Sequence, residues 1–195
     1  MERTGTESRT TQETDITVSM TLDGEGQGDI ATSIPFLDHM LNLLARHGLF
    51  DLTVRGRGDI DVDYHHLIED IGICLGEAIR KAVGDKQGIR RYGWALVPMD
   101  ESLCQVSMDL SGRPCLVFHV DFGTEKLRDL DPALFREFFK SLCDHGGITL
   151  HIQVLYGTNS HHIVESIFKA FARSLDMATA RDTRIEGVMS TKGRL

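Results

Sequence analysis

Two short segments of the chain carry the same pattern of imidazole and carboxylate side chains. "DYHHLIED", from Asp63 to Asp70, contains His-His-x-x-Glu, and "SHHIVES", from Ser160 to Ser166, contains it again. On a helix, residues four apart lie on one face, whereas neighbours are about 100° apart. The first histidine of each pair therefore shares a face with the glutamate, and the second points elsewhere. Imidazole and carboxylate side chains bind metal ions. One motif alone can contribute ligands to two metal sites, but it cannot supply all the ligands of one site.

The two motifs belong to a longer internal repeat. "HMLNLLARHGLFDLTV" aligns with "EFFKSLCDHGGITLHI" and, after a gap of two residues, "HHLIEDIGICLGEAI" aligns with "HHIVESIFKAFARSL". A gap of two preserves the inward and outward alternation of strand residues. We infer a tandem duplication of a β-β-α-type unit. The halves, about 1–90 and 91–195, are each too small to bury a good core alone, so we expect them to pack as one domain with a pseudo-two-fold axis.

A pseudo-two-fold axis would combine the motifs into two equivalent metal sites, with a fourth ligand for each from the aligned pair His39 and Glu137. One site would take His66, His161 and Glu165. The other would take His65, Glu69 and His162, and His39 and Glu137 would each complete one of the two sites. Nitrogen and oxygen ligands without thiolate suit Mn²⁺, Fe²⁺, Co²⁺ or Zn²⁺.

The elements that must position these side chains follow from hydrophobic periodicity. Alternating apolar residues predict a strand over 15–22, and a period of three to four residues predicts a long helix over 65–83. The other predicted strands are 30–35, 49–54, 59–62, several within 92–122, and 148–157. The other predicted helices are 36–48, 131–147 and 161–181. This pattern indicates an α+β fold with helices packed on sheets.

Composition limits the class of protein. The 195 residues are 41% hydrophobic and 26% charged, as in ordinary globular proteins. A net charge of −8 argues against general binding to nucleic acids or membrane surfaces. The apolar runs are too short for a spanning helix and the first residues lack the apolar core of a signal peptide, so we expect a cytoplasmic protein. The four cysteines show no C-x-x-C spacing and are expected to be reduced thiols.

The sequence closely resembles the imidazoleglycerol-phosphate dehydratases of histidine biosynthesis. The resemblance covers nearly the whole chain, through "RTTQETDI", "PFLDHML", "HHLIEDIGICLGEAI", "RYGWALVPMDESL", "DLSGRP", "YGTNSHHIVESIFKAFARSL" and "STKG". It implies a ribosomal-protein-S5-domain-2-like duplicated fold with mixed sheets, two Mn²⁺ ions per subunit and a homo-oligomeric shell of 24 subunits with sites at subunit interfaces. It also implies the ligands of each ion: His39, His66, His161 and Glu165 around one, and His65, Glu69, Glu137 and His162 around the other. Glu137 is a departure, because some relatives carry histidine there.

The resemblance implies further roles. Glu13 is the candidate proton-transfer residue, assisted by His47. The residues implied to hold the substrate phosphate are Arg91, Arg113, Lys169, Ser190 and Lys192. The implied reaction is dehydration of D-erythro-imidazole glycerol phosphate to imidazole acetol phosphate through a metal-stabilised imidazolate. The alternatives are a dinuclear metallohydrolase, which would need a carboxylate bridging two ions roughly 4 Å apart, and a non-catalytic metal-binding shell protein, which would not need the phosphate-binding set.

Overall fold

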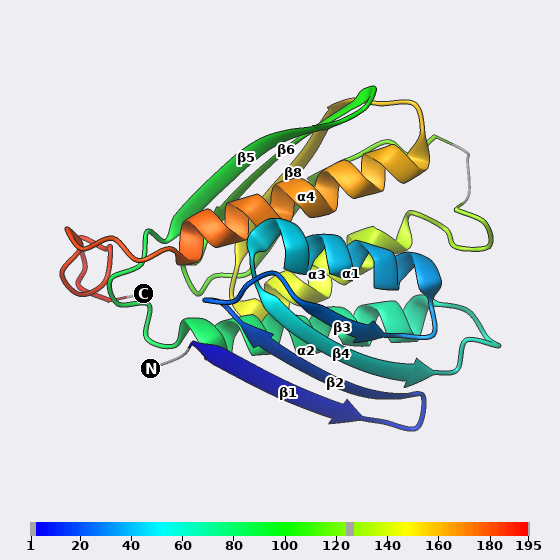
Figure 1. The fold of residues 1–195 in the computed structure, drawn as a ribbon, viewed down its shortest axis with the longest axis horizontal. Helices are drawn as coiled ribbons and strands as arrows, with labels where there is room; N and C mark the ends of the chain where they lie inside the picture. The colour runs from blue at the N-terminus through cyan, green and yellow to red at the C-terminus, as the bar shows by residue number, and fades with distance from the viewer. Residues whose placement is uncertain (1–2, 124–126, 195) are drawn as a thin grey trace.

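Two four-stranded sheets form the frame of the part of the molecule that the structure describes, residues 3–123 and 127–194 (Figure 1). In this computed structural model, the elements of the first half are β1 (Thr4–Thr10), β2 (Thr14–Thr21), β3 (Gly28–Ala31), α1 (Pro35–Gly48), β4 (Asp51–Gly58) and α2 (His65–Val83). Those of the second half are β5 (Tyr92–Met99), β6 (Ser102–Asp109), β7 (Cys115–His119), α3 (Leu134–Gly146), β8 (Thr149–Tyr156) and α4 (Ser160–Thr179). The order βββαβα thus occurs twice.

The two sheets have the same topology. Their strand orders are β1-β2-β4-β3 and β5-β6-β8-β7. In each sheet the last pair, β3–β4 or β7–β8, is parallel and the other pairs are antiparallel. The registers also agree: Met20 pairs with Leu52 in the first sheet, and Met108 pairs with Leu150 in the second. The predicted α+β class and the tandem duplication are therefore confirmed.

The helices interlock the two halves. The long helix α2 packs on β1 and β2, and the long helix α4 packs on β5 and β6. Each short helix packs against the long helix of the other half, α3 on α2 and α1 on α4 (Figure 1). Side chains on α1 therefore meet side chains on α4, although the two helices are far apart in the sequence.

Glycines allow each long helix to lie close to its sheet. A Cβ atom on Gly5 would lie 2.0 Å from the carbonyl oxygen of Ala78, and one on Gly93 would lie 1.8 Å from that of Ser174. Such distances are far inside van der Waals contact, so a side chain at either position would push the strand away from the helix. Each glycine pairs with the methionine of the adjacent strand named above, so this close approach is itself repeated.

A cluster of aromatic side chains fixes α3 and α4 relative to each other. Its members are the fully buried Phe135, Phe138, Phe139, Phe168 and Phe171. Phe168 contacts all three phenylalanines of α3, with ring centroids 5.3–5.6 Å apart. Aromatic pairs at this spacing stabilise a packed core beyond the burial of their area. The cluster therefore fixes the part of α4 that directly follows its histidine motif.

The four predicted helices are confirmed within a few residues of their expected ends. The predicted helix over 65–83 coincides with α2, and that over 36–48 is α1 with one further residue, Pro35, at its start. The helix α3 (Leu134–Gly146) lies within the predicted range 131–147. The helix α4 (Ser160–Thr179) begins just before the predicted range 161–181 and ends just before its end. Among the residues that the structure describes, no helix has both the length and the apolar character needed to cross a membrane.

The predicted strands 30–35 and 59–62 need correction, and one strand was missed. The strand expected over 30–35 is β3, which ends at Ala31, and Pro35 already begins α1. Residues 59–62 were expected to be a strand after a turn, but β4 runs through that turn to Gly58, because it pairs with β2 up to Thr14. Asp59 and the residues after it form a turn closed by a hydrogen bond from Val62 N to Asp59 O. β1 was not predicted, since "TGTESRT" lacks apolar alternation. It is held by backbone pairing with β2 and by cross-strand hydroxyl pairs such as Thr6–Ser19 (2.9 Å).

Candidate metal centre

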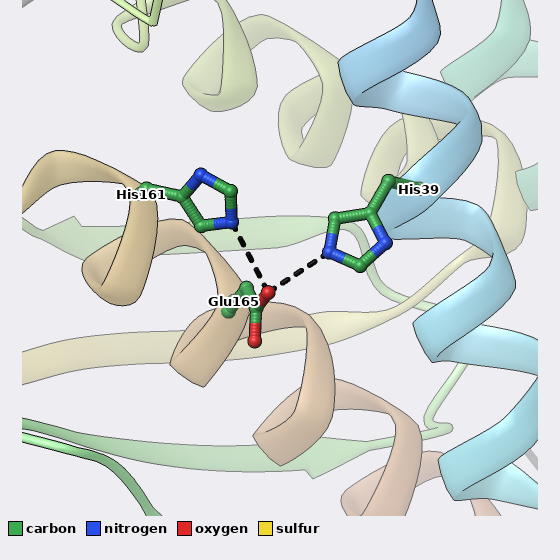
Figure 2. A group of neighbouring side chains, drawn as sticks. All are labelled: His39, His161 and Glu165. Atoms are coloured by element: carbon green, nitrogen blue, oxygen red, sulfur yellow. Dashed lines mark hydrogen bonds and ion pairs between the residues drawn. The ribbon is translucent and has the colours of Figure 1, made fainter.

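Three of the predicted ligands converge where α1 packs on α4 (Figure 2). Glu165 Oε1 lies 2.8 Å from Nε2 of His39 and 3.2 Å from Nε2 of His161. His161 and Glu165 are four residues apart and share one face of α4, whereas His39 reaches them from the other half of the chain. One possible ligand atom from each residue lies within 4.8 Å of the others. We call this group the α1/α4 cluster.

The carboxylate at the centre of the α1/α4 cluster is buried and ionised. Burial opposes its ionisation, but hydrogen bonds from Lys169 (Nζ to Oε2, 2.6 Å) and from His39 outweigh that effect and lower the pKa of Glu165 to about 2. The cluster thus presents two imidazole nitrogens and one carboxylate oxygen. This set of ligand atoms fits a divalent ion such as Mn²⁺, Fe²⁺, Co²⁺ or Zn²⁺.

The corresponding part of the repeat lies on α2 and α3. His65 Nε2 is 3.6 Å from Glu69 Oε2, and Ser141 on α3 donates a hydrogen bond to Glu69 Oε1 (3.4 Å). Glu137 also lies on α3, where its carboxylate accepts a hydrogen bond from Arg136 (3.0 Å). The structure therefore brings His65 and Glu69 together and leaves Glu137 paired with Arg136. We call His65, Glu69 and Glu137 the α2/α3 group.

The second histidine of each motif turns away from both the α1/α4 cluster and the α2/α3 group. His66 Nδ1 lies 3.0 Å from Asp59 Oδ2 and 3.9 Å from Glu13 Oε2. His162 Nδ1 lies 2.6 Å from Glu101 Oε2. Asp59 raises the pKa of His66, and Glu101 raises the pKa of His162. In each case the hydrogen bond to the carboxylate is the largest cause. Within one chain, the structure does not bring His66 to the α1/α4 cluster or His162 to the α2/α3 group.

A separate cavity of about 1130 Å³ gathers cationic side chains beyond the C-terminal end of α4. It contains four of the five predicted phosphate-binding residues: Arg91, Arg113, Ser190 and Lys192. Asp109 accepts two hydrogen bonds from the Arg91 guanidinium (2.6 and 2.9 Å), which raises the pKa of Arg91 and fixes its direction. The fifth residue, Lys169, is bound to Glu165 in the α1/α4 cluster instead. The cavity is a candidate site for an anionic group.

The imidazoleglycerol-phosphate dehydratase family profile matches residues 32–175. The chain belongs to this family. It is 60% identical over 188 residues to the imidazoleglycerol-phosphate dehydratase of Syntrophus aciditrophicus, covering 96% of this chain and 95% of the relative. It is 57% identical to that of Geobacter metallireducens over the whole length of both chains.

Two solved structures share the fold as well. The dehydratase of Pyrococcus furiosus, in complex with (S)-C348, superposes with a TM-score of 0.85 at 38% identity, over 97% of this chain and 100% of that one. The dehydratase of Staphylococcus aureus gives 0.83 at 36% identity, over 92% of this chain and 99% of that one. The resemblance inferred from the sequence is confirmed, and so is the fold that it implied.

Within one chain of this dehydratase, the α1/α4 cluster and the cationic cavity lie far apart. The α1/α4 cluster lies in the first turns of α4, and the cationic cavity lies past the last turn. A helix of 20 residues is roughly 30 Å long. Figure 1 shows the C-terminal segment that lines the cavity leaving the end of α4 opposite to its motif.

The two candidate proton-transfer residues have different surroundings. Glu13 lies in the turn between β1 and β2, and its side chain is 55% exposed. His47 lies near the end of α1, where burial lowers its pKa, with Lys169 and Arg173 lowering it further. His47 is therefore neutral at neutral pH and has a lone pair available to accept a proton.

Reasoning from the sequence missed Asp59 and Glu101, the carboxylates that hold the second histidines. The sequence predicts Asp59 at the start of a strand, whereas the structure places it in the turn that brings it to His66. A signal for Glu101 was present: it stands directly before β6, as Glu13 stands directly before β2. The repeat alignment began only at His39, so it did not extend to this pair.

Proposed function

We propose that the chain dehydrates imidazole glycerol phosphate to imidazole acetol phosphate in histidine biosynthesis. The observation that carries this proposal is the convergence of His39, His161 and Glu165 from the two halves of the chain. Membership of the dehydratase family supports the same reaction. The reaction removes a hydroxyl group and a hydrogen from neighbouring carbons as one water molecule, and the resulting enol becomes the ketone.

We further propose that two divalent cations, Mn²⁺ in the first instance, bind per chain. The residues that would hold one are His39, His66, His161 and Glu165. Those that would hold the other are His65, Glu69, Glu137 and His162. Bound cations would act as Lewis acids toward the two nitrogens of the substrate ring. The set of ligand atoms in the α1/α4 cluster and the ionised state of Glu165 support this assignment.

The chain's own residues would move protons and hold the substrate. Glu13 is our candidate for transferring the proton of the C–H group, because its carboxylate is exposed beside His66. The neutral imidazole of His47 would assist. Arg91 and Arg113 would bind the phosphate with Ser190 and Lys192, and this binding would fix the orientation of the imidazole end.

The distance between the two candidate sites favours a site shared by different copies of the chain. A small phosphorylated imidazole cannot span roughly 30 Å, so a cluster and a cavity that act together would belong to neighbouring copies. By the same sharing between copies, Lys169 would reach the phosphate. His66 and His162 would likewise complete the metal sites of neighbouring copies. Tyr92, Trp94 and Leu96 give β5 an exposed apolar face suited to association. We therefore propose a homo-oligomer, with 24 subunits as the expected state.

The proposal is tested by assaying the purified protein with imidazole glycerol phosphate. We expect product in the presence of Mn²⁺, loss of activity on adding a chelator, and recovery when Mn²⁺ is restored. Glu165→Gln should lose both bound metal and activity, because a neutral amide replaces the central ligand. Full activity of the metal-depleted protein, or of Glu165→Gln without metal, would overturn the proposed role of the cluster.

A further inference from the structure

A carboxylate holds Nδ1 of each second histidine, His162 through Glu101 (2.6 Å) and His66 through Asp59 (3.0 Å). An ionised carboxylate can only accept a hydrogen bond, so Nδ1 must carry the proton and donate it. Because a neutral imidazole has one N–H group, its Nε2 then keeps the lone pair. In both halves the carboxylate therefore selects the same tautomer.

Glu101 is itself held firmly in place. Its Oε1 accepts hydrogen bonds from the backbone N–H groups of Asn159 (2.9 Å) and Thr158 (3.2 Å) and from the hydroxyl of Ser102 (3.2 Å). Asn159 is the N-cap of α4, and its side chain accepts from the backbone N–H of His162 (3.2 Å). One carboxylate thus ties the turn between β5 and β6 to the start of α4 and to the ring of His162.

The same place in the first half is occupied by Glu13. Each glutamate comes directly before the second strand of its hairpin, and the count from Glu13 to Met20 equals that from Glu101 to Met108. Glu13 nevertheless lies 3.9 Å from the nearest imidazole nitrogen and its side chain is 55% exposed. In this half, Asp59 holds the histidine instead. The two equivalent glutamates have therefore diverged, one held rigidly and one left accessible.

We propose that Glu101 is a positioning residue that holds His162 in the orientation and tautomer in which Nε2 ligates a divalent cation, and that Asp59 does the same for His66. This inference rests on the metal-binding function proposed above. It accounts for the divergence of the two glutamates: because Asp59 positions His66, Glu13 remains available to transfer a proton. Carboxylates that orient ligand histidines in this way contribute substantially to metal affinity.

Glu101→Gln tests the proposal directly. The amide oxygen of glutamine can still accept from Asn159 and Thr158, so its NH₂ group then faces Nδ1 of His162 and requires the other tautomer. We expect the affinity of one of the two Mn²⁺ sites to fall by about 10–100-fold. The measurement is a titration of the metal-free full-length protein with Mn²⁺, with free Mn²⁺ detected by electron paramagnetic resonance. Glu25→Gln, on an exposed turn, is the matched control and should titrate like the wild type.

A double-mutant cycle separates positioning from a general structural effect. If Glu101 acts through His162, then Glu101→Gln should weaken Mn²⁺ binding in the wild type and change it less than about twofold in a His162→Ala background. Equal weakening in both backgrounds, or unchanged affinity in a folded Glu101→Gln protein, would overturn the proposal. If Glu101→Gln does not fold, Glu101→Asp replaces it in the cycle, because its shorter side chain keeps the charge but withdraws from Nδ1.

The wild-type titration distinguishes the two levels of inference. Wild-type protein that binds no Mn²⁺ would contradict the proposed metal function and, with it, the role of Glu101. Wild-type protein that binds Mn²⁺ with no dependence on Glu101 would contradict the positioning role alone.

Discussion

Glu165 receives hydrogen bonds from His39, His161 and Lys169 at once, whereas the Glu13 carboxylate is largely exposed. At the scale of single residues, these surroundings separate the possible roles of the carboxylates. A buried carboxylate surrounded by donors stays ionised and fixed, which suits a ligand. An exposed carboxylate beside an imidazole is accessible to the substrate and can transfer a proton, which suits a general acid or base.

Acid should destabilise the metal-free protein partly through Glu165. Its pKa is about 2 in the folded chain and ordinarily 4.5, so its ionised form stabilises the folded state above about pH 4.5. That contribution is lost as the pH falls from 4.5 toward 2. We expect the free energy of unfolding of Glu165→Gln to fall less steeply across this range than that of the wild type. Denaturant unfolding at several pH values measures the two slopes, and equal slopes would contradict the argument. Glu25→Gln controls for the removal of one charge.

At the scale of elements, the packing of each short helix on the long helix of the other half creates the candidate metal centre. α1 carries His39 from the first half onto α4, where the second motif begins. Close contact between the long helices and the sheets keeps α1 and α4 in position. This close contact depends on Gly5 and Gly93.

Gly93→Ala should destabilise the fold. The new methyl group would lie 1.8 Å from the carbonyl oxygen of Ser174, a backbone atom that cannot move without shifting α4. We expect a loss of about 1–3 kcal/mol, as for other overpacked sites. Thermal or denaturant unfolding measures it, with Arg57→Ala on an exposed position of β4 as a control that should change stability by less than about 0.5 kcal/mol. Unchanged unfolding of Gly93→Ala would show that the strand and helix are less tightly packed than described.

The helices and the repeat could be predicted from the sequence because helical periodicity and the duplicated motifs are local signals. The pairing of His161 with Glu165 followed from their spacing alone. β1 could not be predicted, because backbone pairing and cross-strand hydroxyl pairs with β2 hold it, and neither requires alternating apolar residues in its own sequence. Glu101 was missed although it matches Glu13 in the repeat, because its contact with His162 at the start of α4 produces no periodic pattern of residues in the sequence.

At the scale of the whole molecule, the described part of the chain contains the α1/α4 cluster of candidate metal ligands, the looser α2/α3 group and a cationic cavity, but it does not join them within a chain. The α1/α4 cluster contains three of four proposed ligands, and the second histidines remain with their own orienting carboxylates. The cavity lies beyond the opposite end of α4. Association of copies is therefore the step that we expect to complete each active site.

Mixing two inactive variants tests this sharing most directly. His39→Ala removes a ligand from the cluster, and Arg113→Ala removes a cation from the cavity. If each active site combines the cluster of one copy with the cavity of another, equal amounts dissociated and reassembled together should recover about a quarter of wild-type activity, since random assortment leaves that share of sites intact. Each variant reassembled alone controls for residual activity. Activity in the mixture no higher than in the separate variants would contradict the shared site and place the whole reaction within one chain.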